Sequence, residues 1–360
     1  MGDLANHTDA HSDPHQAEVE IRSGSVSDAG AFLFRNVCEA LHQAMQVMLI
    51  DSSGLPGFAL RTILAEDLTA EVQRHRDAAA QDPRPFRAER LGGTVVAKCN
   101  HLQAGDRSAL VIFDDIFWRD DKDEFALASG CATIAHEMAH CALYELRGRV
   151  ERGGPSANQT IGEQAAREIV SDVLEEYRAD GIAGAFLAVI GERVENGTRQ
   201  RLRLHDIDGD EYAEQLLKVL DNEVHPGWRN RVQQYREHAV PLEEMFLALS
   251  RSAWEAFVLV AHASAVANSA GRLDPLDEFA AHPGVRLYLH DPWKCIRELA
   301  REYPLLGTQA ESIELEAKVL DVGVPAVMRM WECLGLTFRL KPSGVTYIHV
   351  EEPRSDEEAP

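Results

Sequence analysis

The stretch ATIAHEMAHCALYEL, residues 132–146, places two histidines four positions apart in a run with no proline, no glycine and apolar residues at helical spacing. Residues four apart on a helix project from the same face, so the imidazoles of His136 and His140 can reach one cation. Glu137 lies beside that face, where its carboxylate can take a proton from a zinc-bound water. Because so short a pattern also arises by chance, a third ligand must be sought elsewhere in the chain.

A second helix is predicted over residues 160–190, and it carries the expected third ligand. Thr160 and Glu163 have the spacing of a capping box, and apolar residues recur after them at steps of three and four. Glu176 and Asp180 lie one turn apart on this stripe, where a carboxylate is costly unless it is paired or bound to a metal. The alternative interpretation, that the wide polar face of this helix simply overlaps the stripe, is weaker than metal binding. We therefore expect Glu176 to be the third zinc ligand and Asp180 to orient a ligand imidazole.

A third element, HPGWRNR at residues 225–231, extends the pattern. The histidine motif, the segment EYRAD at residues 176–180 and this His-Pro-x-x-x-x-Arg element resemble, in the same order, the motifs of gluzincin metallopeptidases of the HtpX and CAAX-prenyl-protease type. The resemblance covers residues 93–232. It implies that His225 and Arg231 lie close to the catalytic zinc, with His225 as a donor to the oxyanion. Those relatives are usually embedded in membranes, and this chain departs from them in that respect.

The hydropathy of the chain predicts no segment that spans a membrane. The most apolar stretches, residues 182–190 and 254–267, are shorter than the about 20 apolar residues needed to cross a bilayer. The first 20 residues are polar and acidic and do not resemble a signal peptide. Six scattered cysteines without a Cys-x-x-Cys pair favour reduced thiols over a disulfide framework. We therefore expect a soluble, cytoplasmic protein.

The net charge bears on the class of partner. A formal charge of −23, from 36 basic and 59 acidic side chains, argues against binding to phosphate backbones and anionic lipid. The acidic surplus favours solubility and could attract basic substrate segments, although an acidic surface is on average only solvated. We therefore expect a protein or peptide substrate and no nucleic-acid partner.

The expected fold class is α+β and mostly helical, with a zincin-like catalytic core made of a small sheet and the active-site helix. Strand-like runs at residues 94–98 and 109–113 precede the histidine helix, as the edge strand of a zincin does. An extended substrate can add to such an edge by backbone hydrogen bonds. The predicted division is a disordered tail (1–25), a helical region (26–90), the metallopeptidase core (91–232), a helical region (233–284), a unit of three helices and a hairpin (285–352) and an acidic tail (353–360).

Beyond residue 232 the sequence offers two further features that could carry chemistry. His262 lies inside an apolar run and is predicted to be a hydrogen-bonded core residue. Three helices followed by a hairpin over residues 285–352 are compatible with a winged helix. The helix that would read DNA offers only Arg329, and basic and acidic residues balance at eight each between 285 and 350. A protein-contact or structural role is therefore favoured over DNA binding there.

Together these features predict a soluble, zinc-dependent endopeptidase. His136, His140 and Glu176 hold the metal and leave a fourth position for water. Glu137 deprotonates this water as it attacks the scissile carbonyl, and then protonates the leaving amine. A different class stays open, namely a zinc-carrying regulatory or sensor protein similar to the ImmA/IrrE group, with a structural or vestigial site. Glu137 and the count of three ligands disfavour it, because a structural site needs no base and is normally closed by four protein ligands.

We expect the purified protein to show no salt-sensitive binding to duplex DNA at physiological ionic strength, because its acidic surplus repels phosphates. Fluorescence anisotropy of a labelled duplex, measured over a series of salt concentrations, tests this expectation. A steep decrease in affinity with added salt that Arg329→Ala removes would show instead that the C-terminal unit binds DNA.

Overall fold

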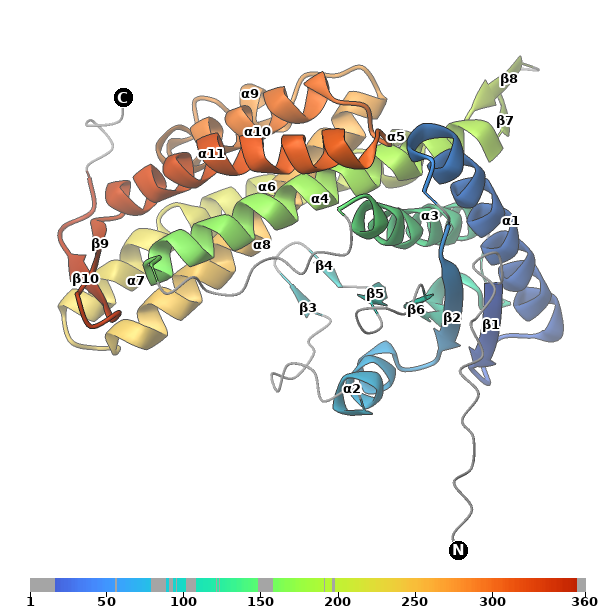
Figure 1. The fold of residues 1–360 in the computed structure, drawn as a ribbon, viewed down its shortest axis with the longest axis horizontal. Helices are drawn as coiled ribbons and strands as arrows, with labels where there is room; N and C mark the ends of the chain where they lie inside the picture. Colours follow the sequence, from blue (N-terminus) through green and yellow to red (C-terminus); the bar gives the residue numbers. More distant parts are fainter. Residues whose placement is uncertain are drawn as a thin grey trace, which may run out of the picture.

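The computed structural model describes residues 17–354, except 56, 79–88, 91–92, 95, 102–107, 121, 123, 148–157, 191 and 196–197. The chain is mostly helical, with a small mixed sheet and a separate antiparallel hairpin. The predicted α+β, mostly helical fold class is therefore confirmed. Figure 1 shows the sheet and its helices at one end of the molecule and a bundle of long helices beside them.

The mixed sheet consists of β1 (Ala17–Arg22), β2 (Ala59–Ala65), β6 (Ser108–Asp114) and β5 (Ala97–His101), in the order β1-β2-β6-β5. β1 is parallel to β2 and β2 to β6, whereas β5 is antiparallel to β6. Within the described part of the chain β5 pairs only with β6. It is therefore an edge strand, and it directly precedes β6 and the histidine helix along the chain.

The two faces of the sheet pack against different helices. In β6, Val111 and Phe113 belong to the core shared with α1 (Asp28–Ser53) and α3 (Glu124–Leu146). Ile112 points to the opposite face, into the small core that α2 completes with residues such as Leu68 and Val72. This alternation is the period of two that an extended strand imposes. Because both faces are covered, β6 is apolar along nearly its whole length.

The N-terminal part differs from the sequence-based prediction. The region 26–90, expected to be helical, contains β2, and the tail 1–25, expected to be disordered, contributes β1. β2 reads ALRTILA, and a short apolar run of this kind does not distinguish a buried strand from a buried helix. β1 is ordered by its pairing with β2, a contact that composition does not encode. Residues 1–16 of the tail, and 355–360 at the other end, lie outside the described residues.

α4 (Ile161–Ile190) connects the two parts of the molecule. The predicted capping box is present, since the Thr160 hydroxyl accepts from the Glu163 N–H at 3.2 Å and the Glu163 carboxylate accepts from the Thr160 N–H at 2.7 Å. The first half of α4 contributes Val173 to the core of the helical bundle. The second half contributes Phe186 to the core formed with α1, α3 and the sheet. Both cores therefore include the same helix, which Figure 1 shows running through the centre.

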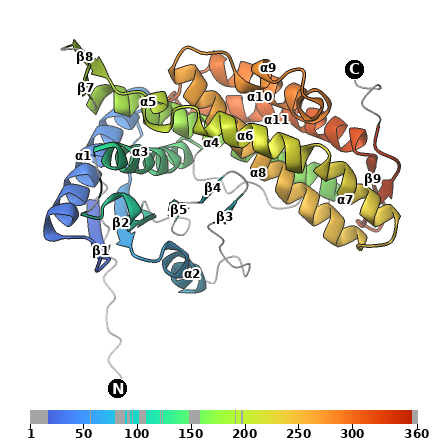
Figure 2. The ribbon, with the colours of Figure 1, turned by 180° about the vertical axis from the view of Figure 1, so that it is seen from behind.

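The bundle surrounds the first half of α4. Its members are α6 (Glu211–Val219), the π-helical η2 (Leu220–Val224), α7 (Gly227–Arg236), α8 (Leu242–Ser269), α9 (Pro275–Glu278), the π-helical η3 (Val285–Leu289), α10 (His290–Glu302) and α11 (Gln309–Cys333). α8 lies along α4, and α6 packs on α8 (Figure 2). The unit 285–352 has two long helices where three were predicted, because α11 continues through Pro325.

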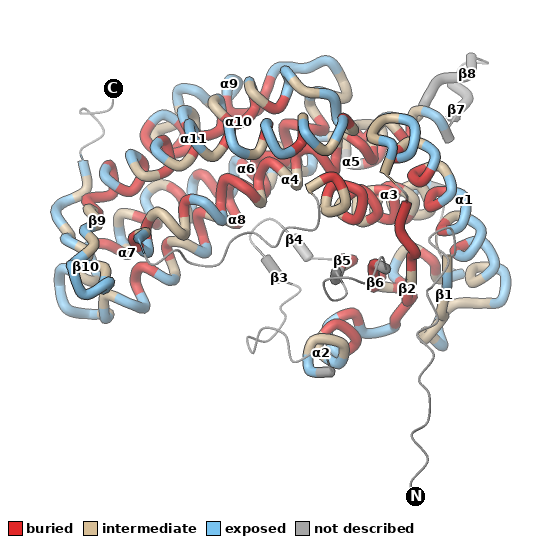
Figure 3. The backbone as a smooth tube through the Cα atoms, in the orientation of Figure 1, coloured by how far each residue is buried: buried red, intermediate tan, exposed pale blue. Residues whose placement is uncertain are grey.

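Shorter elements complete the described part of the chain. They are the 3-10 turn η1 (Asp115–Phe117), α5 (Leu204–Asp208), and the two-stranded pairs β3 (Glu89–Arg90) with β4 (Gly93–Thr94) and β7 (Glu192–Glu195) with β8 (Thr198–Arg201). Figure 3 shows that burial is concentrated where the long helices face one another, and that their outward faces are exposed. None of the described helices combines the length and the hydropathy that a membrane span requires.

The C-terminal hairpin of β9 (Leu336–Leu340) and β10 (Thr346–Val350) packs on the start of α4. The Ile161 N–H, at the first turn of α4, donates to the Thr346 hydroxyl at 3.0 Å. Leu336 belongs to the same core as α4, α8 and α11. The predicted boundaries at 232/233 and 284/285 therefore do not coincide with a break in this core.

We expect Gly162→Val to destabilise the protein by about 1–3 kcal/mol, the range for overpacking a well-filled contact. A Cβ added at Gly162 would lie 2.6 Å from a ring carbon of Phe338. The ring of Phe338 also contacts that of Phe246, with ring centroids 5.3 Å apart, which limits its room to move. Urea unfolding of the variant measures the change in free energy of unfolding.

The matched control is Glu168→Val, which introduces the same side chain at an exposed position of the same helix. It should change the free energy of unfolding by no more than about 0.5 kcal/mol. Equal effects of the two substitutions would show that the hairpin does not press on the start of α4.

Candidate metal centre

The packing of α3 against α4 brings the three predicted metal ligands together. One ligand atom each from His136, His140 and Glu176 lies within 4.8 Å of the other two. Ala139 on α3 and Ala179 on α4 are fully buried in the same core, and such small side chains let two helices approach closely. The group that the sequence predicted is therefore assembled, and it could hold a metal ion.

The spacing of the donor atoms fits tetrahedral coordination. Nε2 of His136 lies 3.0 Å from Nε2 of His140. Oε2 of Glu176 lies 3.2 Å from the first of these nitrogens and 3.4 Å from the second. Four donors placed tetrahedrally at about 2.0–2.1 Å from a zinc ion are separated by about 3.3 Å. The three distances lie close to that value, so one ion can contact all three atoms with little movement of the side chains.

Each imidazole is oriented by a carboxylate on α4. Nδ1–H of His136 donates to Oδ1 of Asp180 at 2.7 Å, and Nδ1–H of His140 donates to Oε1 of Glu175 at 2.8 Å. The other oxygen of Glu175 pairs with Arg147 at 2.9 Å. Donation from Nδ1 leaves the lone pair on Nε2, the atom that a metal binds. The geometry matches the role predicted for Asp180, whereas the sequence analysis missed Glu175 and Arg147.

Charges around the centre favour a bound cation. Burial lowers the pKa of His136, but the carboxylates of Asp180 and Glu176 outweigh it and raise this pKa to about 10. In His140, too, burial is outweighed by Glu176 and Glu175, which raise the pKa well above its usual value. Burial raises the pKa of Glu176, yet the two imidazoles hold it well below its usual range. The cluster thus favours positive charge at its middle, either as protons or as a metal ion.

His262, on α8, is a fourth group at this centre. Its Nδ1 lies 2.7 Å from Oδ2 of Asp180, and its Nε2 lies 3.9 Å from Oε2 of Glu176. The ring of Tyr212 stacks on it, with ring centroids 5.3 Å apart. The predicted hydrogen bond of His262 is therefore confirmed, but the sequence analysis did not connect this residue with the site. An imidazole inside an apolar run was the available signal, because it needs a polar partner from another element.

The predicted base, Glu137, is half-buried and follows His136 on α3. Adjacent residues of a helix diverge by about 100°, so Glu137 flanks the triad rather than belonging to it. The edge strand β5 packs against the same helix. Sγ of Cys99 on β5 lies 3.3 Å from Sγ of Cys141, the residue after His140. The edge strand therefore lies next to the histidine helix.

The contacts described for His225 and Arg231 are with groups outside the triad. The ring of His225 lies 6.4 Å from that of His282, and Arg231 pairs with Glu223 at 2.7 Å. Tyr212, which stacks on an imidazole of the centre, precedes His225 by 13 positions along α6 and η2. At about 1.5 Å per helical residue this separation approaches 20 Å. That distance does not support a hydrogen bond from His225 to a group held at the triad, so its predicted catalytic role is not carried further.

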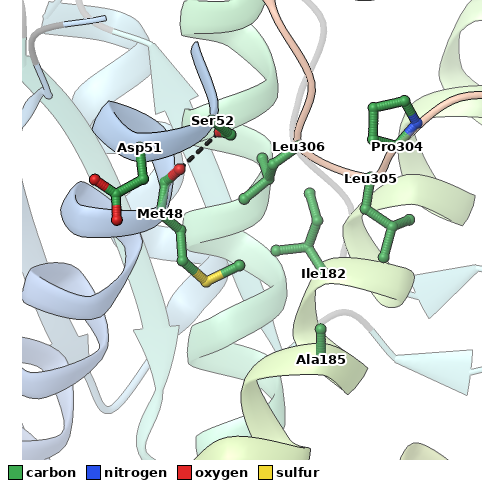
Figure 4. Close-up of a pocket in the computed structure, with 8 residues that line it drawn as sticks. All are labelled: Met48, Asp51, Ser52, Ile182, Ala185, Pro304, Leu305 and Leu306. Atoms are coloured by element: carbon green, nitrogen blue, oxygen red, sulfur yellow. Dashed lines mark hydrogen bonds between the residues drawn. The ribbon is translucent and has the colours of Figure 1, made fainter. Parts of the chain in front are cut away.

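A pocket of about 380 Å³ lies between α1, α4 and residues 304–306. Figure 4 shows that the apolar side chains of Met48, Ile182 and Leu305 line it. On α4, Arg178 donates to the carbonyl oxygen of Leu305 at 2.8 Å and so ties this loop to the helix. The pocket includes no member of the triad, and its loop supports α4 from the outer side.

Comparison of the chain with protein-family models, curated proteins and solved structures finds no match. The resemblance to gluzincin metallopeptidases stays a prediction from sequence motifs.

We expect one divalent metal ion per chain, measured by elemental analysis after equilibration with the metal and removal of the excess. His140→Ala and Glu176→Ala should lose most of it, because each removes a donor atom. Asp180→Asn and Glu175→Gln should weaken metal affinity by roughly 10- to 100-fold, as changes to groups that orient ligands do. Glu168→Gln, at an exposed position of α4, is the control and should bind normally. Full occupancy in Glu176→Ala would show that α4 does not supply a ligand.

Proposed function

We propose that this chain is a zinc-dependent endopeptidase of gluzincin type, acting on a protein or peptide substrate. The observation that carries the proposal is the convergence of His136, His140 and Glu176, with each imidazole oriented by a carboxylate of α4. Two imidazoles and a carboxylate are a donor set that zinc binds, and three protein ligands are typical of catalytic rather than structural zinc. Glu137 supplies an acid–base group on the same helix.

Zinc at this centre would supply Lewis acidity, which activates water and polarises a carbonyl oxygen. Glu137 accepts a proton from the attacking water while the water oxygen bonds to the carbonyl carbon of the substrate. When the carbon–nitrogen bond breaks, the same carboxyl group delivers that proton to the leaving amine. Asp180 and Glu175 keep the two imidazoles in one orientation throughout, so little reorganisation accompanies the reaction.

The edge strand β5 supports a peptide as the substrate. Its outer side is unpaired within the described residues, and it lies against the histidine helix. An extended peptide can add to such an edge through main-chain hydrogen bonds, which tolerate many side chains. The formal charge of −23 favours basic segments among such peptides. We infer a protease with broad sequence tolerance.

A cytoplasmic location forms part of this proposal. All six cysteines, which lie among the described residues, are thiols, and those of Cys99 and Cys141 share a hydrogen bond of 3.3 Å. Disulfides form and persist in oxidising compartments, so a reducing compartment suits thiols in such close contact.

The proposal is tested with Glu137→Gln, which keeps the shape of the side chain but removes the base. Wild-type and variant protein, both loaded with zinc, are incubated with a denatured proteome, and new peptide termini are identified by mass spectrometry. We expect wild-type protein to generate new termini and the variant to lose roughly 10²- to 10⁴-fold in cleavage rate, as loss of a general base does. Zinc content should be equal in the two proteins.

Glu168→Gln provides the matched control, because it makes the same chemical change at an exposed position and should cleave like the wild type. Termini that appear equally with Glu137→Gln would contradict the mechanism. If the fully loaded wild type produced no new termini from any pool, the evidence would favour a zinc-binding regulatory protein.

A further inference from the structure

Arg147 lies on the face of the histidine helix that meets α4. Its backbone N–H donates to the Leu143 carbonyl oxygen at 3.1 Å, so the helical hydrogen-bond pattern of α3 continues through it. It comes seven positions after His140, about two helical turns, and side chains at that separation project from the same face. Its guanidinium is therefore placed to contact the part of α4 that supports the imidazoles.

Glu175 connects Arg147 to the metal centre. Its Oε1 accepts from Nδ1–H of His140 at 2.8 Å, and its Oε2 pairs with Nη1 of Arg147 at 2.9 Å. A chain of contacts thus leaves α3 at His140, crosses to one carboxylate of α4 and returns to α3 at Arg147. Both charged side chains are only 15% exposed, so the solvent screens their attraction weakly.

A glutamate needs such a second contact more than an aspartate does. Asp180, which orients His136, has two side-chain torsions, and its second oxygen is held by Nδ1 of His262 at 2.7 Å. Glu175 has three torsions, so it loses more rotamer freedom when it is fixed on an imidazole. Arg147 holds the second oxygen of Glu175 and leaves Oε1 directed at His140.

Arg147 is itself held in place. Its guanidinium lies over the ring of Tyr144, 5.9 Å from the ring centroid, within the range of a cation–π contact. Its Nε is buried without a hydrogen-bond partner among the described residues. An ion pair buried in this way contributes little net stability, because desolvation offsets much of the attraction. The consequence of the pair therefore lies in the orientation of Glu175 rather than in holding α3 to α4.

We propose that Arg147 is a positioning residue of the metal centre, which fixes Glu175 so that the Nε2 lone pair of His140 points at the ion. The ligand set stays at His136, His140 and Glu176. The inference rests on the metal centre of the proposed function but not on peptide hydrolysis. It concerns only one of the two imidazoles, since His136 is oriented by Asp180.

A double-mutant cycle on cobalt(II) affinity tests the inference without an assay of hydrolysis. Arg147→Met removes the charge and the donors while it keeps an unbranched side chain. We expect it to weaken cobalt binding by roughly 3- to 30-fold, the range of couplings between contacting residues. In the Glu175→Gln background the same substitution should change the affinity by less than about 2-fold, because the carboxylate through which Arg147 acts is gone.

The orientation of His140 also has a spectroscopic signature. Bound cobalt(II) moves the resonances of ligand protons far outside the ordinary range, so Nδ1–H of each imidazole is followed separately by proton NMR. Glu175→Gln identifies the proton of His140, and Asp180→Asn identifies that of His136. Arg147→Met should shift the His140 proton and speed its exchange with water, while the His136 proton stays unchanged. A general loosening of the contact between the helices would move both.

Two further variants separate the ion pair from unrelated effects. Arg147→Lys keeps a cation without the planar fork, and it should bind cobalt more tightly than Arg147→Met but less tightly than wild type. It carries the same NMR readout should Arg147→Met fail to fold. Arg167→Met makes the same chemical change at an exposed position of α4 and should retain the wild-type affinity and both resonances.

Wild-type cobalt affinity in Arg147→Met would overturn the inference, as would a loss of equal size in the Glu175→Gln background. Either result would leave the three-ligand centre and the proposed hydrolysis intact. A wild-type protein that binds no cobalt would overturn the inference and the proposed function together. Coupling between Arg147 and Glu175, combined with no peptide cleavage by the zinc-loaded wild type, would support the role of Arg147 and contradict the proposed function alone.

Discussion

The contact between α3 and α4 is the constraint on which the rest of the structure depends. α4 contributes to two cores at once, the helical bundle along its first half and the sheet with α1 and α3 along its second half. Its position is therefore set from both sides, and it cannot slide against α3 without opening one core. The acidic residues Glu175, Glu176 and Asp180 lie where these two cores meet. Ala139 and Ala179 are small and fully buried in the core that the two helices share, which permits a close approach of α3 and α4.

Three carboxylates within six residues of a largely buried helix would be costly without partners. In this structure the carboxylates have partners. Glu175 contacts His140 and Arg147, and Asp180 contacts two imidazoles. Glu176 is left between the imidazoles, in contact with groups that a cation would bridge. The same contacts that stabilise the crossing of the helices therefore prepare a metal site. β5 packs on α3, and α8 packs on α4 and brings His262 to the centre.

The sequence by itself determined the features that depend on helical spacing. His136 and His140 share a face because they are four apart, and the same rule places Glu176 and Asp180 one turn apart on the buried stripe of a second helix. Because a buried carboxylate is costly without a partner, Glu176 and Asp180 were predicted to belong to the metal site of the first helix. Local signals also predicted the capping box at Thr160, the closing hairpin and the mostly helical fold class.

Only the tertiary structure decided which elements meet at the centre. The pairing of Glu175 with His140, and the approach of His262 from α8, depend on how α3, α4 and α8 cross, which periodicity within one helix does not specify. The same limit applies to His225, whose motif suggested a place near the metal, whereas its described ring contact is with His282. β1 and β2 were missed for a related reason, because parallel strands are stabilised by partners distant in the sequence. A sequence pattern defines the face that an element presents, but long-range packing selects the neighbour that meets it.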